Sequence, residues 1–180
     1  MKTQIDGRRI IIRKLSQRDA PDIYRNIRDK DIVKWTIIIP HPYYPEYAKR
    51  FIRLRTCNWK HKTSYAFGIV LKQSGEVIGI VDLSPVNWPD KNAELGAWLG
   101  KRYWGKGYMT EAVNLILKFG FRELKLHRIY ARLFESNIGS QKVLEKTGFK
   151  AEGRLRHSLY KRRRWHNELV YGILRGEFGG

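Results

Sequence analysis

The residues from Gly100 to Ala112 have the types and the spacing of an anion-binding turn. They read G-K-R-Y-W-G-K-G-Y-M-T-E-A, with Gly105 and Gly107 one residue apart. Glycine permits a tight turn and lets bare backbone N–H groups come close to a ligand. A helix that begins directly after the turn would add its unpaired N–H groups and the positive end of its dipole. The stretch therefore predicts a site for a phosphate or pyrophosphate.

The spacing excludes two common phosphate-binding motifs. A dinucleotide fingerprint needs G-x-G-x-x-G, and a P-loop needs G-x-x-x-x-G-K-[ST]. Gly107 is instead followed by Y-M-T, and no lysine–serine or lysine–threonine pair closes the loop. What remains is R-x-x-G-x-G, formed by Arg102, Gly105 and Gly107. Taken alone, these six residues also fit an ordinary glycine turn before a helix.

Length and composition set the class of protein. The 180 residues suit one domain, residues 1–180 with a core over about 8–174, and 6 Trp, 10 Tyr and 7 Phe exclude a disordered chain. No apolar run reaches the roughly 18 residues of a membrane span, and the charged N-terminus has no signal-peptide core. We therefore expect a cytoplasmic protein with no membrane partner. The lone Cys57 excludes an internal disulfide, and with no cluster at metal-ligand spacing we expect no metal.

The net charge points to the kind of partner. The chain has 36 basic and 17 acidic residues, a formal net charge of +19. Such a field favours an anionic partner, namely coenzyme A, RNA or a ribosomal surface. It disfavours a small polycationic substrate unless a local acidic pocket overrides it. The basic run Lys161 to Arg164 is either a solvated turn or a grip on the phosphates of ribosomal RNA.

Hydrophobic periodicity and turn residues predict an α/β chain in the order β-α-α-β-β-β-α-β-α-β-β. The stretch 35–45 is rich in proline and aromatic residues and is predicted to be a loop. The predicted strand 92–99 ends at the glycine turn, and the most regular helical pattern follows it. The predicted strands are 8–14, 64–71, 76–83, 92–99, 127–134, 151–160 and 165–174, and the predicted helices are 16–29, 46–58, 108–124 and 137–146.

This order and several motifs resemble the GNAT N-acetyltransferases, over about residues 8–174. The R-x-x-G-x-G turn resembles the family's acetyl-CoA pyrophosphate loop, [QR]-x-x-G-x-[GA], and G-Y-M-T-E-A at 107–112 resembles the G-Y-x-T-E-A of its RimJ/RimL branch of protein N-terminal acetyltransferases. A-E-L-G-A-W-L at 93–99 resembles that branch's A-E-[IL]-G-Y-W-[IL], with Ala97 in place of tyrosine. N-I-G-S-Q-K-V-L-E-K-T-G-F at 137–149 resembles N-x-x-S-x-[RK]-V-[LM]-E-K-x-G-F.

The resemblance implies a fold and a cofactor. The fold is a central mixed, mostly antiparallel twisted sheet flanked by helices, with a splayed strand pair for acetyl-CoA. Backbone N–H groups of the glycine loop would bind the pyrophosphate, the strand end would pair with the pantetheine arm, and Asn137 and Lys142 would contact pantetheine and an adenosine-side phosphate. The predicted cofactor-binding residues are Trp98, Leu99, Arg102, Trp104, Gly105, Lys106, Gly107, Tyr108, Met109, Asn137 and Lys142.

The implied chemistry is direct transfer of acetyl from acetyl-CoA to an amine, without an acyl-enzyme, and with a backbone N–H near Trp98 stabilising the oxyanion. Ser140 is the predicted donor of a proton to the thiolate, unless it only helps to cap a helix. Glu94 is the first choice for the general base, unless it is a structural carboxylate. Asp82 acting through water, or an acceptor that arrives deprotonated, are the alternatives. The position where some RimL-type enzymes carry a carboxylate is Leu159 here.

The acceptor is the least determined part of the prediction. The leading hypothesis is the N-terminal α-amine of a protein, of the ribosomal-protein type. The alternatives are a small amine, such as a polyamine, an aminoglycoside or an amino acid derivative, and a non-catalytic module that binds CoA or RNA. In this family the loop that contains Trp35, His41 and Tyr43 borders the acceptor site, so these residues are predicted to shape specificity. The sequence leaves open whether the protein is a monomer or a homodimer.

Overall fold

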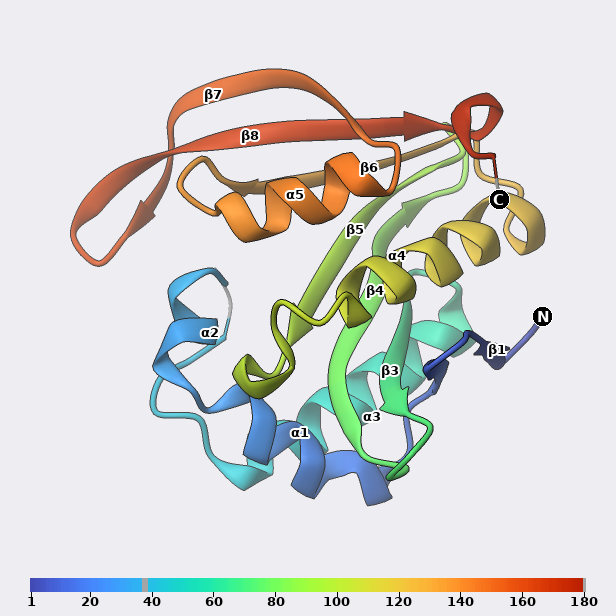
Figure 1. The fold of residues 1–180 in the computed structure, drawn as a ribbon, viewed down its shortest axis with the longest axis vertical. Helices are drawn as coiled ribbons and strands as arrows, with labels where there is room; N and C mark the ends of the chain where they lie inside the picture. Colours follow the sequence, from blue (N-terminus) through green and yellow to red (C-terminus); the bar gives the residue numbers. More distant parts are fainter. Residues whose placement is uncertain (37–38, 180) are drawn as a thin grey trace.

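The computed structural model describes residues 1–36 and 39–179, and a mixed β-sheet lies at its centre (Figure 1). Within these residues the sheet has eight strands in the order β1-β2-β3-β4-β5-β6-β8-β7, and every neighbouring pair is antiparallel except β5 and β6. This confirms the predicted fold class. The strands are β1 (Gln4–Asp6), β2 (Ile10–Lys14), β3 (Tyr65–Leu71), β4 (Val77–Asn87), β5 (Asn92–Leu99), β6 (Arg128–Phe134), β7 (Lys150–Lys161) and β8 (Arg164–Leu174).

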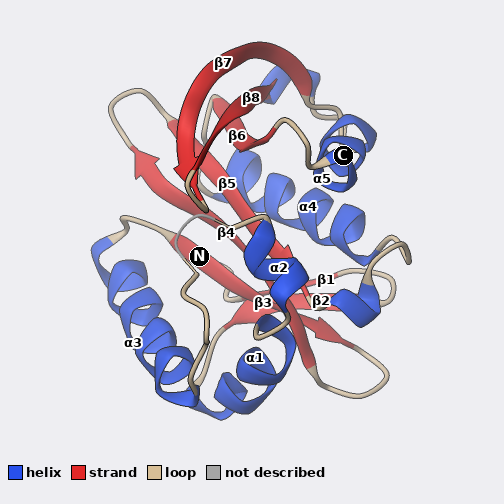
Figure 2. Ribbon diagram, turned by 90° about the vertical axis from the view of Figure 1, so that its left-hand side faces the viewer, coloured by secondary structure: helices blue, strands red, loops and turns tan. Residues whose placement is uncertain are grey.

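Helices cover both faces of the sheet (Figure 2). The helices α1 and α3 pack on one face, and α4 packs on the other, next to α5. The side chains of β4 follow this division, because Ile80 belongs to the cluster under α1 and α3 while Val81 belongs to the cluster under α4. The helices are α1 (Ala20–Ile27), α2 (Lys30–Lys34), α3 (Pro45–His61), α4 (Tyr108–Lys118) and α5 (Ile138–Lys146).

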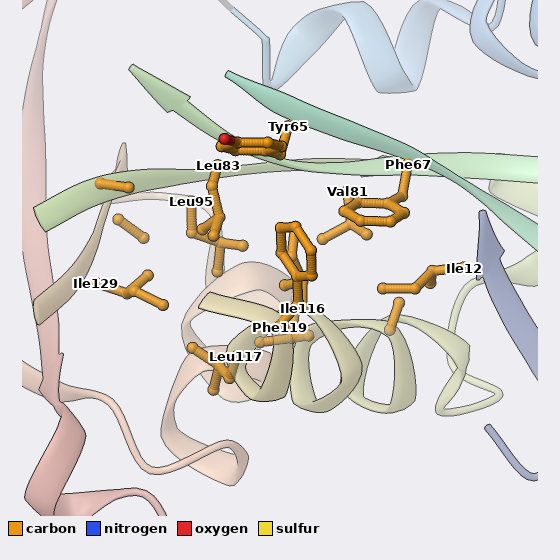
Figure 3. Close-up of a cluster of buried hydrophobic side chains, with 14 of the residues drawn as sticks. Ile12, Tyr65, Phe67, Val81, Leu83, Leu95, Ile116, Leu117, Phe119 and Ile129 are labelled. Carbon is orange, nitrogen blue, oxygen red and sulfur yellow. The ribbon is translucent and has the colours of Figure 1, made fainter. Parts of the chain in front are cut away.

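The larger core cluster lies between the sheet and α4 (Figure 3). Phe119 is 1% exposed, and its ring lies edge-on to Tyr65 and Phe67, with centroids 5.4 and 5.0 Å away. Burying a side chain of this size contributes about 1.5–3 kcal/mol. The helix predicted over 108–124 ends at Lys118 and continues as a π-helical turn over Phe119–Glu123. The residues of this segment that face the sheet are Ala112, Val113, Ile116 and Phe119, and all four belong to the large cluster.

The strands β5 and β6 are in register over three residues only, Asn92–Glu94 against Arg128–Tyr130. Beyond that point β5 stays paired with β4 up to Leu99, and β6 stays paired with β8 up to Phe134. Figure 1 shows the two strands meeting at one end and diverging toward α2. The splayed pair that the family resemblance implied is therefore present, and it opens beside the C-terminal end of β5.

The structure differs from the prediction at short elements. The strand β1 and the five-residue helix α2 were not predicted, because neither is long enough to show a period. The turn between β7 and β8 has two residues, Arg162 and Arg163, and is not the predicted four-residue turn. The predicted loop over 35–45 includes residues 37 and 38, which lie outside the described residues. Across the described chain, no helix combines the length and the apolar character that crossing a bilayer demands.

Candidate active site

The glycine turn has the backbone conformation that its sequence predicts. Gly105 and Gly107 have φ angles of +72° and +79°, in the left-handed region that favours glycine. Gly107 is the N-cap of α4, which begins at Tyr108, and no side chain caps the helix. The N–H groups of the first turn of α4 therefore keep their capacity to bind an anion.

A long-range clamp holds this loop against β2. The Glu111 carboxylate accepts hydrogen bonds from the backbone N–H of Arg9 (2.8 Å), the backbone N–H of Ile10 (3.3 Å) and the Arg9 side chain (3.1 Å). Arg9 also donates to the carbonyl of Lys106 (2.8 Å) and lies over the ring of Tyr108. Burial raises the pKa of Glu111, but the hydrogen bonds from Arg9 outweigh it and leave that pKa lowered. Helical periodicity gives no sign of this clamp, because the partner of Glu111 is about a hundred residues away in the chain.

Two further contacts fix the start of the loop. The Trp104 indole N–H donates to the carbonyl of Leu99 at 2.7 Å, so the indole folds back onto the end of β5. The guanidinium of Arg102 is paired with the carboxylate of Glu76, which also accepts a hydrogen bond from the Tyr103 hydroxyl at 2.7 Å. Arg102 thus ties the loop to the start of β4, and Glu76 neutralises much of its charge.

The other predicted cationic and polar groups lie at the beginning of α5 and on the loop. Lys106 and Lys142 are exposed, and neither forms an ion pair with any residue that the structure describes. Asn137 is the N-cap of α5, and its Oδ1 accepts the backbone N–H of Ser140 at 3.2 Å. This cap uses the Asn137 Oδ1 and the backbone N–H of Ser140. The Ser140 hydroxyl and the Asn137 amide N–H groups take no part in it and can hydrogen-bond a ligand.

On the α1–α3 face of the sheet, Glu94 forms a two-point ion pair with Arg132. The distances from Glu94 Oε1 and Oε2 to the Arg132 guanidinium are 3.2 and 3.1 Å. Both side chains stand where β5 and β6 begin to diverge, because the last paired residue of β6 is Tyr130, opposite Glu94. Trp98 lies further along the same face of β5, half-buried against the smaller core cluster.

The second carboxylate of this face is buried. Asp82 on β4 is 7% exposed and lies 3.2 Å from a guanidinium nitrogen of Arg55 on α3. Burial raises the pKa of Asp82 to about 6, while Arg55 opposes that rise and the nearby Glu94 adds to it. A carboxyl with such a pKa changes its protonation close to neutral pH, which suits a general base. Arg55 also donates to the Ser84 hydroxyl at 3.2 Å, and its Nε has no partner in the described chain.

Comparison with known proteins now decides the family. Residues 9–150 match the model of the acetyltransferase (GNAT) domain. The chain is a GNAT acetyltransferase. It is 30% identical to the uncharacterised N-acetyltransferase YnaD of Bacillus subtilis, over 97% of this chain and 98% of that protein. The crystal structure of a ribosomal-protein-S5-alanine acetyltransferase from Vibrio fischeri matches with a TM-score of 0.88 and 26% identity, over 99% of this chain and 100% of that one. Spermidine N(1)-acetyltransferase of Escherichia coli is 28% identical over 61% of this chain and 59% of that protein.

In this GNAT enzyme the neighbourhood of Leu159 contains a carboxylate that sequence reasoning missed. Leu159 is half-buried and pairs with His166 on β8. Two residues further along β8, Glu168 is 3% exposed and accepts a hydrogen bond from the Ser158 hydroxyl at 3.3 Å. The alternation of β8 was the available signal, since it puts Glu168 on the same face as His166.

The three residues that were predicted to shape specificity, Trp35, His41 and Tyr43, differ in how exposed they are and in what they contact. Trp35 lies edge-on to Phe134 at 6.4 Å, at the end of β6 that is farthest from its pairing with β5. His41 is exposed. Tyr43 is 8% exposed within the smaller core cluster, and burial raises its pKa to about 12. The Tyr43 side chain thus packs into the core under α3, and its predicted influence on specificity stays a prediction.

Proposed function

We propose that this GNAT enzyme acetylates the N-terminal α-amine of a protein, of the ribosomal-protein type, with acetyl-CoA as the donor. The support from comparison is the Vibrio fischeri ribosomal-protein-S5-alanine acetyltransferase, which matches along the whole chain. Ser140 and Asn137 keep the spacing that the RimJ/RimL motif has.

The residues of the open sheet fit the proposed cofactor. Past Glu94, no strand of the described chain pairs with β5 on its β6 side. Apart from the Leu99 carbonyl, which accepts the Trp104 indole N–H, this backbone edge is available for an extended pantetheine arm. Ala97 is exposed there, and its small side chain leaves room that a tyrosine would fill. The N–H groups at the start of α4, with Lys106, would bind the pyrophosphate, and Lys142 would meet the adenosine-side phosphate. Acetyl-CoA supplies the activated acetyl thioester.

The catalytic side chains act in the proposed reaction from two sides. Glu94, or Asp82 through a water molecule, removes a proton from the acceptor ammonium on the α1–α3 face. Ser140, at the start of α5, donates a proton to the departing thiolate. A backbone N–H near Trp98, on the open edge of β5, stabilises the oxyanion. The acceptor thus loses its proton on one face of the sheet, and the thiolate receives a different proton on the other face.

Three acids of the predicted acceptor region already have cationic partners, and this observation carries the choice of acceptor. Glu94 is paired with Arg132, Asp82 with Arg55, and Asp31 of α2 with Lys101. A polyamine needs a field of unpaired carboxylates, because several ammonium groups must be desolvated together. A peptide N-terminus brings one ammonium group on a backbone that is otherwise neutral. Paired acids and a net charge of +19 therefore favour the peptide.

A small amine is the second candidate. Its support is the partial match to the Escherichia coli spermidine N(1)-acetyltransferase. The buried Glu168 adds to that support, because it has no cationic partner within 4.0 Å in the described chain, as a small ammonium substrate would require.

The test is release of CoA from acetyl-CoA with short peptides that begin with Ala, Ser or Met. Matched peptides with an acetylated N-terminus are the control, because they differ only in the α-amine. We expect turnover with the free peptides, none with the blocked ones, and an acetyl group on the α-nitrogen by mass spectrometry. Turnover with spermidine or an aminoglycoside, and not with any peptide, would replace the proposal with the second candidate.

A further inference from the structure

Two large aromatic side chains are exposed side by side at the end of the β7–β8 hairpin. Tyr160 and Trp165 pair across the two strands, with ring centroids 4.9 Å apart and an interplanar angle of 52°. They are 62% and 59% exposed. Neither ring belongs to a core cluster, and adjacent exposed aromatic residues are characteristic of a binding surface.

Three arginines surround the aromatic pair. Arg162 and Arg163 form the turn, with φ angles of +52° and +61°, and Arg164 begins β8. All three are exposed, and no carboxylate in the described chain lies within 4.0 Å of any of them. By contrast, Arg154 further along β7 is paired with Glu135. The tip, defined as Tyr160, Arg162, Arg163, Arg164 and Trp165, therefore carries uncompensated positive charge.

Lys161 does not belong to this surface. Its ammonium group turns inward and donates to the carbonyls of Val33 and Thr36 at the C-terminal end of α2. Burial lowers the pKa of Lys161, as expected for a group that has left water. In the predicted basic run, the three arginines are therefore exposed to solvent, whereas Lys161 points inward and anchors the hairpin. The anchor fixes the hairpin against α2, and Figure 1 shows the hairpin end projecting past the rest of the molecule.

We propose that the tip binds single-stranded RNA. Unstacked bases would stack on Tyr160 and Trp165, and Arg162, Arg163 and Arg164 would contact the phosphates. Exposed aromatic rings interleaved with cations are the chemistry that single-stranded nucleic acids recognise. Duplex RNA hides its base faces, and an acidic protein would leave the rings without stacking partners. The predicted acceptor loop contains Trp35, directly after α2, so RNA on the tip would hold the enzyme next to an RNA-bound protein acceptor. This last consequence rests on the proposed function, whereas the RNA site does not.

The experiment measures binding of a fluorescein-labelled oligouridine to the full chain without acetyl-CoA, over a range of salt concentrations. Trp165→Ala and Tyr160→Ala should each weaken binding about tenfold, and Trp165→Phe should retain most of it, because stacking needs only a ring. A triple Arg162→Gln, Arg163→Gln, Arg164→Gln variant should weaken binding and flatten its salt dependence, since each lost phosphate contact lowers the slope by about 0.7. All four variants should keep the CoA-release activity of the wild type.

Two matched controls separate a site from general charge. Lys91, Lys125 and Arg175 line a cleft of about 460 Å³ at the far end of β8, and changing all three to Gln removes the same charge as the arginine triple variant. Tyr44, 50% exposed and edge-on to Tyr47, is an exposed aromatic residue that does not belong to the tip. Tyr44→Ala and the cleft variant should each weaken oligouridine binding less than the corresponding tip variants do. Equal losses from both charge variants, no loss from Trp165→Ala, or tighter binding of duplex RNA would each overturn the proposal.

Discussion

Asp82 and Gly96 lie directly opposite each other on β4 and β5, and the Asp82 carboxylate occupies the space where a side chain at residue 96 would begin. A Cβ at this position would overlap the Asp82 Oδ1. The absence of a side chain at Gly96 therefore lets a buried acid lie flat on β5, within reach of Arg55 and of the electrostatic field of Glu94. This relationship links a glycine of the family motif to the charge arrangement of the α1–α3 face of the sheet.

Substituting Gly96→Ala should displace the Asp82 carboxylate and strain its pair with Arg55. We expect a loss of unfolding free energy of about 1–3 kcal/mol, typical of overpacking a filled site. Urea unfolding of the single variants and of the double variant with Asp82→Ala measures it. In the Asp82→Ala background the added methyl group should cost little. An equal cost in both backgrounds would show that Asp82 is not what the methyl group meets.

The buried Asp82 should leave a signature in the dependence of stability on pH. Its pKa is about 6 in the folded protein, above the ordinary value of 3.8, so between about pH 4 and 6 the folded state binds more protons. Stability due to this group is therefore present below pH 4 and is lost as the pH rises toward 6, by up to about 1.4 kcal/mol per pH unit. Asp82→Asn should remove that negative slope, whatever it does to the absolute stability.

Asp19 provides the control of opposite sign. Arg13 donates two hydrogen bonds of 2.8 Å to Asp19, and together with hydrogen bonds from Ser16 they lower the pKa of Asp19 although burial opposes them. Its contribution is present above its unfolded pKa and is lost as the pH falls through the folded one. Asp19→Asn should therefore remove a positive slope at acid pH and leave the Asp82 slope between pH 4 and 6. If Asp82→Asn leaves that slope unchanged, another group is responsible for it.

The local features of this chain were predictable from sequence because each depends on neighbouring residues. The R-x-x-G-x-G turn gives Gly105 and Gly107 positive φ angles, and Asn137 caps α5 through a hydrogen bond to the residue three positions later. The strand that precedes the turn was predicted with its bounds, Asn92–Leu99, because its alternation is uninterrupted.

The charge pairs were not predictable, because each joins residues far apart in the chain. Glu94 and Arg132 are on β5 and β6, Asp82 and Arg55 join a strand to a helix, and nothing near Glu111 indicates Arg9. The inward turn of Lys161 was hidden for the same reason, since its partners are the carbonyls at the end of α2. A sequence shows that a residue is charged, and only the fold shows what neutralises it.

The glycine loop should tolerate no side chain at Gly105 without loss of cofactor affinity. Gly105 and Gly75 have the same φ of +72°, and a Cβ added at either residue would meet no atom within 4 Å, so Ala at either site introduces the same backbone strain of about 1 kcal/mol. Only Gly105 lies on the predicted pyrophosphate loop. Titration of CoA by calorimetry should show at least tenfold weaker binding for Gly105→Ala and wild-type binding for Gly75→Ala. Equal affinities would remove Gly105 from the predicted site.

Glu94 should matter more to turnover than its ion-pair partner. If Glu94 takes the proton from the acceptor, Glu94→Gln should lower kcat by about 10²-fold or more, because the amide cannot act as a base. Arg132→Gln keeps the carboxylate and removes only its partner, so its effect on kcat should be smaller. Steady-state CoA release with an Ala-initiated peptide measures both. A full rate in Glu94→Gln together with a collapse in Asp82→Asn would transfer the role of base to Asp82.

Ser140 allows a catalytic role to be separated from a structural one. The cap of α5 uses the backbone N–H of Ser140 and the side chain of Asn137, so the Ser140 hydroxyl is not needed for it. Ser140→Ala should therefore change the unfolding free energy by less than about 0.5 kcal/mol and lower kcat at least tenfold, whereas Asn137→Ala should cost about 1 kcal/mol by loss of the cap. Urea unfolding and CoA release on the same preparations give both quantities. Unchanged kcat in Ser140→Ala would mean that the thiolate takes its proton from another donor, while a large loss of stability would assign Ser140 a structural role.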